Sequence, residues 1–145
     1  MPRCRVIALS AVLCFGVAPV ARADCFDAAA QYHQVNPWIL RAIAWAESHN
    51  QPSAVHRNEN GSVDYGLMQI NSVHLDELKP FGVSTGTLMQ GCPNVYVAAW
   101  HLKRQMQKYG NTWLAVGAYH SETPALRDRY AAQILVVLRD WKVVR

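Results

Sequence analysis

The sequence predicts a compact, mainly α-helical domain that is closed by one disulfide. Apolar residues recur at three- and four-residue spacing in successive segments, which is the period of a helix with one buried face. No segment keeps the alternation of a half-buried strand, and no internal repeat or low-complexity stretch interrupts the chain. Two cysteines outside an expected N-terminal leader supply the disulfide.

Residues 1–23 have the pattern of a secretory signal peptide. Arg3 and Arg5 give a positive start, residues 6–20 form an apolar run too short to span a membrane, and Ala21-Arg22-Ala23 provides a small-x-small cleavage pattern. We therefore expect a periplasmic protein without stable membrane insertion, whose one functional domain covers residues 24–145. Of the 145 residues, 122 remain after these 23, which is enough for one core.

The leader also accounts for most of the charge. Three of the 14 basic residues lie in it, so 11 basic and 10 acidic residues remain over 24–145, and this balance gives no case for nucleic-acid binding. Neither Cys14 nor Cys25 follows the small residues of a lipoprotein cleavage site. In an oxidising compartment, Cys25 and Cys92 can form one disulfide, worth roughly 4 kcal/mol by chain entropy. A free buried cysteine is the alternative.

The first two expected helices meet at an Asn-Pro pair. Asp24 or Asp27 can cap the first helix through a side-chain oxygen. Asn36 can cap the second, over residues 37–49, and Pro37 suits its first position because an N–H there would have no partner within the helix.

The middle of the chain carries more turn signals than helix signals. Residues 50–63 are predicted to form a polar loop. Residues 65–71 form a short apolar segment in which Gly66 indicates a turn or a close backbone approach. Glycines and a proline then leave room for short helices near 74–78 and 85–90.

Three further helices are predicted in the last third. They cover residues 93–109 with Gly110 as the stop, about 112–119, and about 124–141. The apolar stripe of the first of these is Val95, Ala99, Leu102 and Met106, and that of the last is Leu126, Tyr130 and Ile134.

Glu47 is the strongest candidate for chemistry. On a helix over 37–49, Leu40, Ile43, Ala44 and Glu47 fall on one face, so the face that buries apolar residues carries a carboxylate to the edge of the core. Desolvation there would raise the pKa of Glu47, which a general acid near neutral pH needs. The alternative is that Glu47 ends the helix and points into solvent.

The sequence gives little support for other catalytic groups. The six histidines are scattered and none pair at helical zinc spacing, so we expect no metal and no cofactor. A Ser48–His49 nucleophile is unsuitable because adjacent helical side chains do not face each other. Most of the remaining acids occupy polar or capping contexts. Asp64 directly precedes the apolar segment, and it is either a turn residue or a second carboxylate facing Glu47.

Three ordered motifs resemble those of family 1 lytic transglycosylases, which have the goose-type lysozyme-like fold. They are Ala46-Glu47-Ser48, then Tyr65-Gly66-Leu67-Met68-Gln69-Ile70-Asn71, then Ala115-Val116-Gly117-Ala118-Tyr119. The resemblance covers nearly the whole chain after the leader. The small one-domain form is most similar to the enzymes that accompany type III secretion, conjugation and type IV pilus machines.

The resemblance implies cleavage of the β-1,4 bond between N-acetylmuramic acid and N-acetylglucosamine in peptidoglycan. Glu47 would be the single acid/base. It would protonate the departing oxygen and then accept the proton of the muramic C6 hydroxyl as that hydroxyl closes onto C1, which leaves a 1,6-anhydro sugar. Ordinary glycosidases need two carboxylates, whereas a substrate that supplies its own nucleophile needs one.

The resemblance also suggests roles for other residues. Ser48 would orient Glu47 or the substrate, unless it is a plain helix-surface serine. Tyr119 would form a hydrogen bond near Glu47 and hold its position, and Tyr130 resembles a second tyrosine of the cleft. The residues expected to line the cleft are Gly66, Leu67, Met68 and Gln69. Of these, Gly66 would let the glycan approach the backbone, and Gln69 would offer amide hydrogen bonds.

One position departs from the family pattern. The common Ala-Tyr-Asn-Ala-Gly reads Ala118-Tyr119-His120-Ser121-Glu122 here, so His120 replaces an asparagine that usually contacts substrate. A histidine there could make activity more sensitive to pH.

The expected function is therefore a lytic transglycosylase that opens peptidoglycan for a secretion, conjugation or pilus machine. Two alternatives stay open. One is a hydrolytic lysozyme in which Asp64 positions a water, and the other is a non-catalytic peptidoglycan-binding assembly factor.

Overall fold

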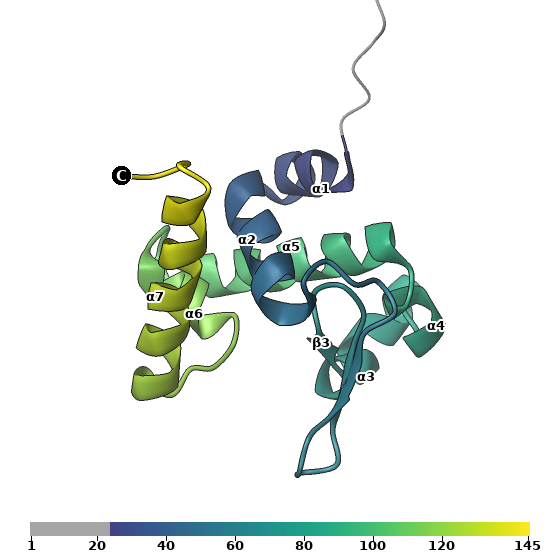
Figure 1. The fold of residues 1–145 in the computed structure, drawn as a ribbon. Coiled ribbons are helices and arrows are strands. Elements are labelled where there is room, and N and C mark those ends of the chain that lie inside the picture. The colour runs from purple at the N-terminus through teal and green to yellow at the C-terminus, as the bar shows by residue number, and fades with distance from the viewer. Residues whose placement is uncertain (1–23) are drawn as a thin grey trace, which may run out of the picture.

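The structure, a computed structural model, describes residues 24–145, and the predicted leader lies outside this range. It confirms a mainly helical fold with a small sheet (Figure 1). The elements in order are α1 (Cys25–His33), α2 (Pro37–Ser48), β1 (Val55–Arg57), β2 (Val63–Tyr65), β3 (Ile70–Asn71), the 3-10 turn η1 (Ser72–His74), α3 (Leu75–Leu78), the 3-10 turn η2 (Lys79–Phe81), α4 (Thr85–Leu88), α5 (Gly91–Tyr109), α6 (Trp113–Ala118) and α7 (Pro124–Asp140).

The N-terminal caps form as the sequence predicts. The Asp24 carboxylate accepts a hydrogen bond of 3.0 Å from the Asp27 backbone N–H at the start of α1. The Asn36 side chain accepts one of 2.8 Å from the Trp38 N–H at the start of α2. α2 ends at Ser48, after which His49 takes a left-handed conformation at φ 53°. These two ends fix the length of the helix that carries Glu47.

The small antiparallel sheet was not predicted from the sequence. It has the order β1-β2-β3, and Asp64 of β2 lies opposite His56 on one side and Asn71 on the other. All three side chains of β1 are exposed. Strands this short, with an exposed edge, lack the alternation of apolar and polar residues that identifies a strand in a sequence. The sequence therefore predicted a polar loop over residues 50–63.

α5 forms the centre of the fold. It contacts α1, α2, α4, α6 and β3, while α7 packs on both α2 and α6. It begins at Gly91, two residues before the predicted start. The largest fully buried apolar side chains of the shared core come from four different helices and the 65–71 segment, namely Leu40, Ile43, Met68, Leu88, Val95, Leu102, Ile134 and Leu138.

The predicted disulfide is confirmed. Cys25 and Cys92 are bonded, with Cα atoms 5.4 Å apart, and the bond joins the start of α1 to the start of α5 across 67 residues of sequence. The resulting loop contains α2, the sheet and the short helices.

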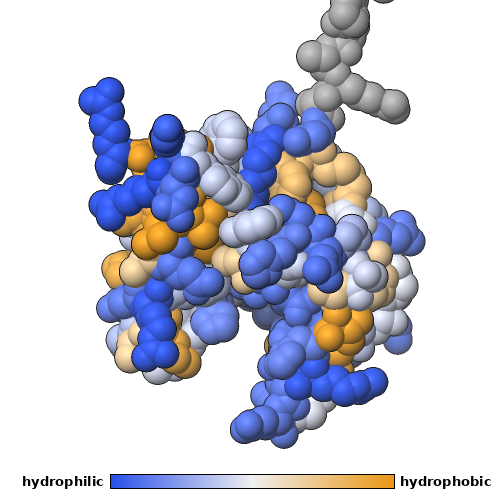
Figure 2. Space-filling view, in the orientation of Figure 1, coloured by the Kyte–Doolittle hydropathy of each residue, from blue (hydrophilic) through white to orange (hydrophobic). Residues whose placement is uncertain are grey.

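These elements leave a hollow between two sides of the molecule. α6 and α7 lie on one side of α2, and the sheet with α3 and α4 lies on the other (Figure 1). The space-filling view shows an indentation between these sides (Figure 2). Among residues 24–145, none of the helices is both long and apolar enough to cross a membrane.

Candidate active site

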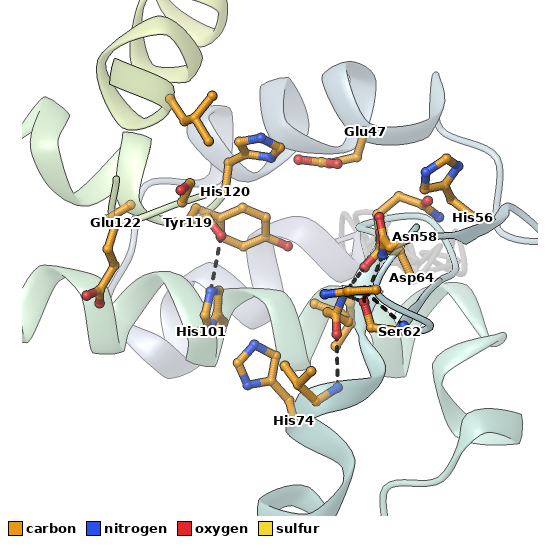
Figure 3. Close-up of a pocket in the computed structure, with 18 of the residues that line it drawn as sticks. Glu47, His56, Asn58, Ser62, Asp64, His74, His101, Tyr119, His120 and Glu122 are labelled. Carbon is orange, nitrogen blue, oxygen red and sulfur yellow. Dashed lines mark hydrogen bonds between the residues drawn. The ribbon is translucent and has the colours of Figure 1, made fainter. Parts of the chain in front are cut away.

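The hollow is a cleft of about 1150 Å³ that contains the candidate acid. Its walls come from the end of α2, the sheet, one face of α5 and the loop that follows α6. Of the residues singled out from the sequence, the lining includes Glu47, Asp64, Gln69, Tyr119 and His120 (Figure 3).

Glu47 lies at the edge of the core, as its helical face predicts. Leu40, Ile43 and Ala44 on the same face are fully buried, and Glu47 itself is mostly buried while reaching the cleft. Burial raises the pKa of Glu47 to about 7, and the negative charge of Asp64 adds to the rise. A hydrogen bond from Tyr130 acts in the opposite direction. This carboxyl therefore keeps its proton to a higher pH than a hydrated glutamate does.

Tyr130 is the tyrosine that contacts Glu47. Its hydroxyl donates a hydrogen bond of 2.5 Å to Glu47 Oε1, from the middle of α7 to the end of α2. The Tyr130 ring is 6% exposed, and burial raises the pKa of its phenol well above the usual value, so the hydroxyl keeps its proton. One carboxyl oxygen of Glu47 is thereby held in place.

Tyr119 has a different partner from the one the sequence suggested. Its hydroxyl donates a hydrogen bond of 2.9 Å to the Met68 carbonyl rather than to Glu47. The ring is 8% exposed and burial raises its pKa well above the usual value. Tyr119 therefore fixes the 65–71 segment, while Tyr130 restrains the acid.

Ser48 also binds this segment. Its hydroxyl donates to the Leu67 carbonyl at 2.7 Å and accepts from the Gln51 N–H at 3.0 Å. In the structure Ser48 joins the end of α2 to the 65–71 segment; it forms no hydrogen bond with the Glu47 carboxyl and does not line the cleft. It is partly buried, so it is not a plain surface serine either.

Gly66 faces the interior instead of the cleft. Its φ is +75°, and a Cβ there would lie 2.2 Å from the Leu88 carbonyl oxygen and 2.7 Å from the Asn94 amide nitrogen. Leu67 and Met68 are buried as well, at 7% and 0% exposure, and neither lines the cleft. Three of the four predicted lining residues are thus structural in this geometry.

Gln69 is the member of the motif that reaches the cleft. It takes a left-handed conformation at φ 49°, and its Nε2 donates to the Gly66 carbonyl at 2.8 Å and to the Ala54 carbonyl at 3.3 Å. Because the amide N–H groups contact the backbone, the side-chain oxygen is the atom best suited to meet a ligand.

Asn94, to which no sequence motif pointed, holds the 65–71 segment in place. Its fully buried side chain accepts from the Met68 N–H at 2.7 Å and donates to the Tyr65 and Leu88 carbonyls, both at 2.9 Å. An amide directly before Val95, the first residue of the apolar stripe of α5, was the signal that could have identified it, because a buried amide requires partners.

Asp64 is a strand residue, not a turn residue. Its two carboxylate oxygens accept hydrogen bonds from Asn58 Nδ2 at 2.9 Å and from Asn71 Nδ2 at 2.7 Å. Both amides also donate to the Ser62 hydroxyl, at 3.1 Å and 3.0 Å. Figure 3 shows Asp64 and Glu47 on opposite walls of the cleft. The alternative of a second carboxylate facing Glu47 is therefore the one that the geometry supports.

The floor of the cleft contains residues that the sequence gave no reason to select. His101 of α5 contacts the Tyr119 carbonyl through Nε2 at 3.2 Å, and burial lowers its pKa to about 4. Its ring therefore stays neutral, and the neighbouring Gln105 is also buried. Within residues 24–145, no three His, Cys, Asp or Glu side chains come together as metal ligands would.

Comparison with known proteins agrees with these motifs. The sequence model of the Transglycosylase SLT domain family matches residues 24–133. The invasion protein IagB of Salmonella typhimurium is 43% identical over 119 residues, which cover 79% of this chain and 74% of IagB. Protein IpgF of Shigella flexneri is 43% identical over 113 residues, covering 77% and 74%. The X polypeptide of Escherichia coli is 39% identical over 99 residues, covering 68% and 59%.

Proposed function

The chain belongs to the Transglycosylase SLT family and is a lytic transglycosylase, and from this premise we propose a product and a division of roles. The substrate is a peptidoglycan glycan strand, cut at the β-1,4 bond between N-acetylmuramic acid and N-acetylglucosamine. The product is a 1,6-anhydro-muramic end. The catalytic domain occupies residues 24–145.

The observation that carries the proposal is the carboxyl of Glu47, whose pKa is about 7 and which lies at the wall of a cleft. With Oε1 held by Tyr130, the second oxygen presents the acidic proton to the glycosidic oxygen. Proton transfer to that oxygen breaks its bond to C1 of the muramic sugar and releases the N-acetylglucosamine end. A general acid is most effective when its pKa lies near the working pH.

The same carboxylate completes the reaction. Glu47 accepts the proton of the muramic C6 hydroxyl while O6 forms the new bond to C1. The acid is thus regenerated and no water is consumed. The burial of Glu47 favours this second step because a poorly hydrated carboxylate is a stronger base than a hydrated one.

Asp64 supports both steps through its charge. Two amides hold its carboxylate on the wall opposite Glu47, and its negative charge can stabilise the oxocarbenium-like transition state at C1. The same position would suit a carboxylate that orients a water, so hydrolysis is the second candidate reaction.

Peptidoglycan as substrate implies an extracytoplasmic site of action. We propose the periplasm, reached by means of the predicted leader, and a role in opening the wall for a secretion, conjugation or pilus machine. The name of IagB, an invasion protein, is in keeping with that role.

Mass spectrometry of the fragments released from purified sacculi tests the proposal. Anhydro-muropeptides from the wild type and none from Glu47→Gln are the expected result. Fragments with a reducing muramic end would instead identify a lysozyme-like hydrolase. Binding to sacculi with no released fragment, together with normal function of Glu47→Gln in the cell, would indicate a non-catalytic assembly factor.

A further inference from the structure

His120 lies flat against the tyrosine that holds the candidate acid. The His120 and Tyr130 rings have centroids 4.9 Å apart and an interplanar angle of 7°. Tyr119 lies roughly parallel to Tyr130 as well, at 6.5 Å and 17°. His120 is exposed and lines the cleft, whereas Tyr130 is almost fully buried and does not line it. The imidazole therefore covers the phenol on the side of the cleft.

The fold brings these rings together through a close contact between two helices. A Cβ on Gly117 of α6 would lie 2.2 Å from the Arg127 carbonyl oxygen of α7, so the two helices touch there without a side chain between them. His120 follows Gly117 by three residues and Tyr130 follows Arg127 by three residues. The contact at Gly117 thus sets the distance at which the rings stack.

We propose that His120 is a positioning residue whose ring, by stacking on Tyr130, covers the hydrogen bond between the Tyr130 hydroxyl and Glu47 and keeps water away from it. This inference rests on the proposed role of Glu47. Figure 3 shows the His120 ring beside the Glu47 carboxyl, which is where a covering group must lie. The flat face of the ring performs this role, so its nitrogen atoms are dispensable for it.

Several titratable groups share this environment and must be considered in any test. Asp64 faces Glu47 from β2, Tyr130 from α7 and Tyr119 from the end of α6, and His56 lies across the cleft on β1. Replacing His120 by phenylalanine or by alanine leaves all of these in place. His120→Phe keeps the stack, and His120→Ala removes it.

The test compares these two variants in the purified protein by kinetics and by NMR titration of the Glu47 carboxyl. In His120→Ala, kcat should fall about three- to tenfold, because this is the rate change that corresponds to the stabilisation lost with one aromatic pair. Water admitted by this change should also move the titration of Glu47 to lower pH. His120→Phe should restore the wild-type titration and most of kcat. As a control, His33→Ala removes an edge-to-face partner of Tyr96 outside the cleft and should change neither property.

Two results would overturn the inference. One is a Phe variant as impaired as the Ala variant, with a raised KM, because that would make the imidazole nitrogens a substrate contact. The other is an unchanged Glu47 titration in His120→Ala. Because the titration needs no turnover, it decides the matter even if the wild type yields no anhydro product, a result that would refute the proposed reaction instead.

Discussion

The Tyr130 hydroxyl donates a hydrogen bond to Glu47 Oε1 across 83 positions of sequence. It is the link between α7 and the candidate acid on α2. The bond has two effects on the acid. It fixes one carboxyl oxygen, which favours catalysis, and it stabilises the ionised form, which lowers the pKa of Glu47 against the effect of burial.

Tyr130→Phe should therefore weaken catalysis and shift its pH dependence. A hydrogen bond to a charged group contributes about 1.5–3 kcal/mol, so kcat should fall roughly ten- to a hundredfold. Without the donor the pKa of Glu47 rises, and the alkaline limb of the pH–rate profile should move to higher pH. A profile that stays in place would mean that the hydroxyl does not reach the carboxyl in solution.

Tyr119→Phe is the matched variant with a different expected outcome. Its hydroxyl bonds to the Met68 carbonyl, so its loss should lower the free energy of unfolding by about 1 kcal/mol and reduce kcat less than Tyr130→Phe does. Denaturant unfolding and the pH–rate profile separate the two effects. If Tyr119→Phe inactivates as fully as Glu47→Gln, the division of roles between the tyrosines is wrong.

Asp64→Asn should lower the pH at which activity declines. The negative charge of Asp64 raises the pKa of Glu47, so neutralising it lowers that pKa and leaves fewer molecules protonated at pH 7. The alkaline limb of kcat/KM should move to lower pH. Asp76→Asn, which removes an exposed carboxylate outside the cleft, is the control and should leave the limb unmoved.

Glu47→Gln should change the pH dependence of stability. The pKa of Glu47 is raised from 4.5 to about 7 on folding, so the folded state binds more protons between these values. The related contribution to stability is fully present below pH 4.5 and is lost as pH rises through 7, by at most about 3 kcal/mol. Calorimetry at pH 5 and 8 should show a smaller decline for the variant. A large loss of melting temperature at pH 5 would instead identify Glu47 as structural.

Removing the disulfide should destabilise the protein without altering the cleft. Cys25→Ser with Cys92→Ser should cost about 4 kcal/mol, because the unfolded chain regains the freedom of a 67-residue loop. Thermal unfolding of the double variant and of the reduced wild type should give similar melting temperatures. Neither cysteine lines the cleft, so the pH–rate profile of the folded fraction should match the wild type.

Gly66→Ala should be far more damaging than Gly82→Ala. The two glycines have nearly equal φ values of +75° and +76°, so alanine suffers the same backbone strain at each. At Gly82 the new methyl meets nothing within 4 Å, whereas at Gly66 it meets the Leu88 carbonyl oxygen. The difference in unfolding free energy between the two variants isolates the close approach. Equal losses would show that the segment can move away.

Local signals predicted the helices and the position of Glu47 at the edge of the core. Asn36 and Pro37 start α2 where the capping rules place them, and the helical period then puts Glu47 beside buried Ile43. Each of these features depends on residues within a dozen positions of one another. The chemistry of a single helix face was therefore accessible from the sequence.

The partnerships across the cleft were not accessible in the same way. In the sequence, Asn58 and Asn71 look like ordinary polar loop residues. Only the register of the small sheet brings both amides to Asp64. Ser48 was predicted to orient Glu47 or the substrate, and Gly66 to admit the glycan to the backbone, because their motifs were considered without the packing; in the fold both residues fix one segment. Contacts between distant elements depend on tertiary geometry that a linear pattern does not contain.

The link between α2 and α7 also makes the order of events during synthesis important. On the proposed chemistry, a nascent polypeptide that ends after β3 carries Glu47 but lacks the Tyr130 hydroxyl that holds it. It also lacks α7, which helps to exclude water from the carboxyl. An enzyme that digests the cell's own wall would thus stay harmless until its last long helix has docked.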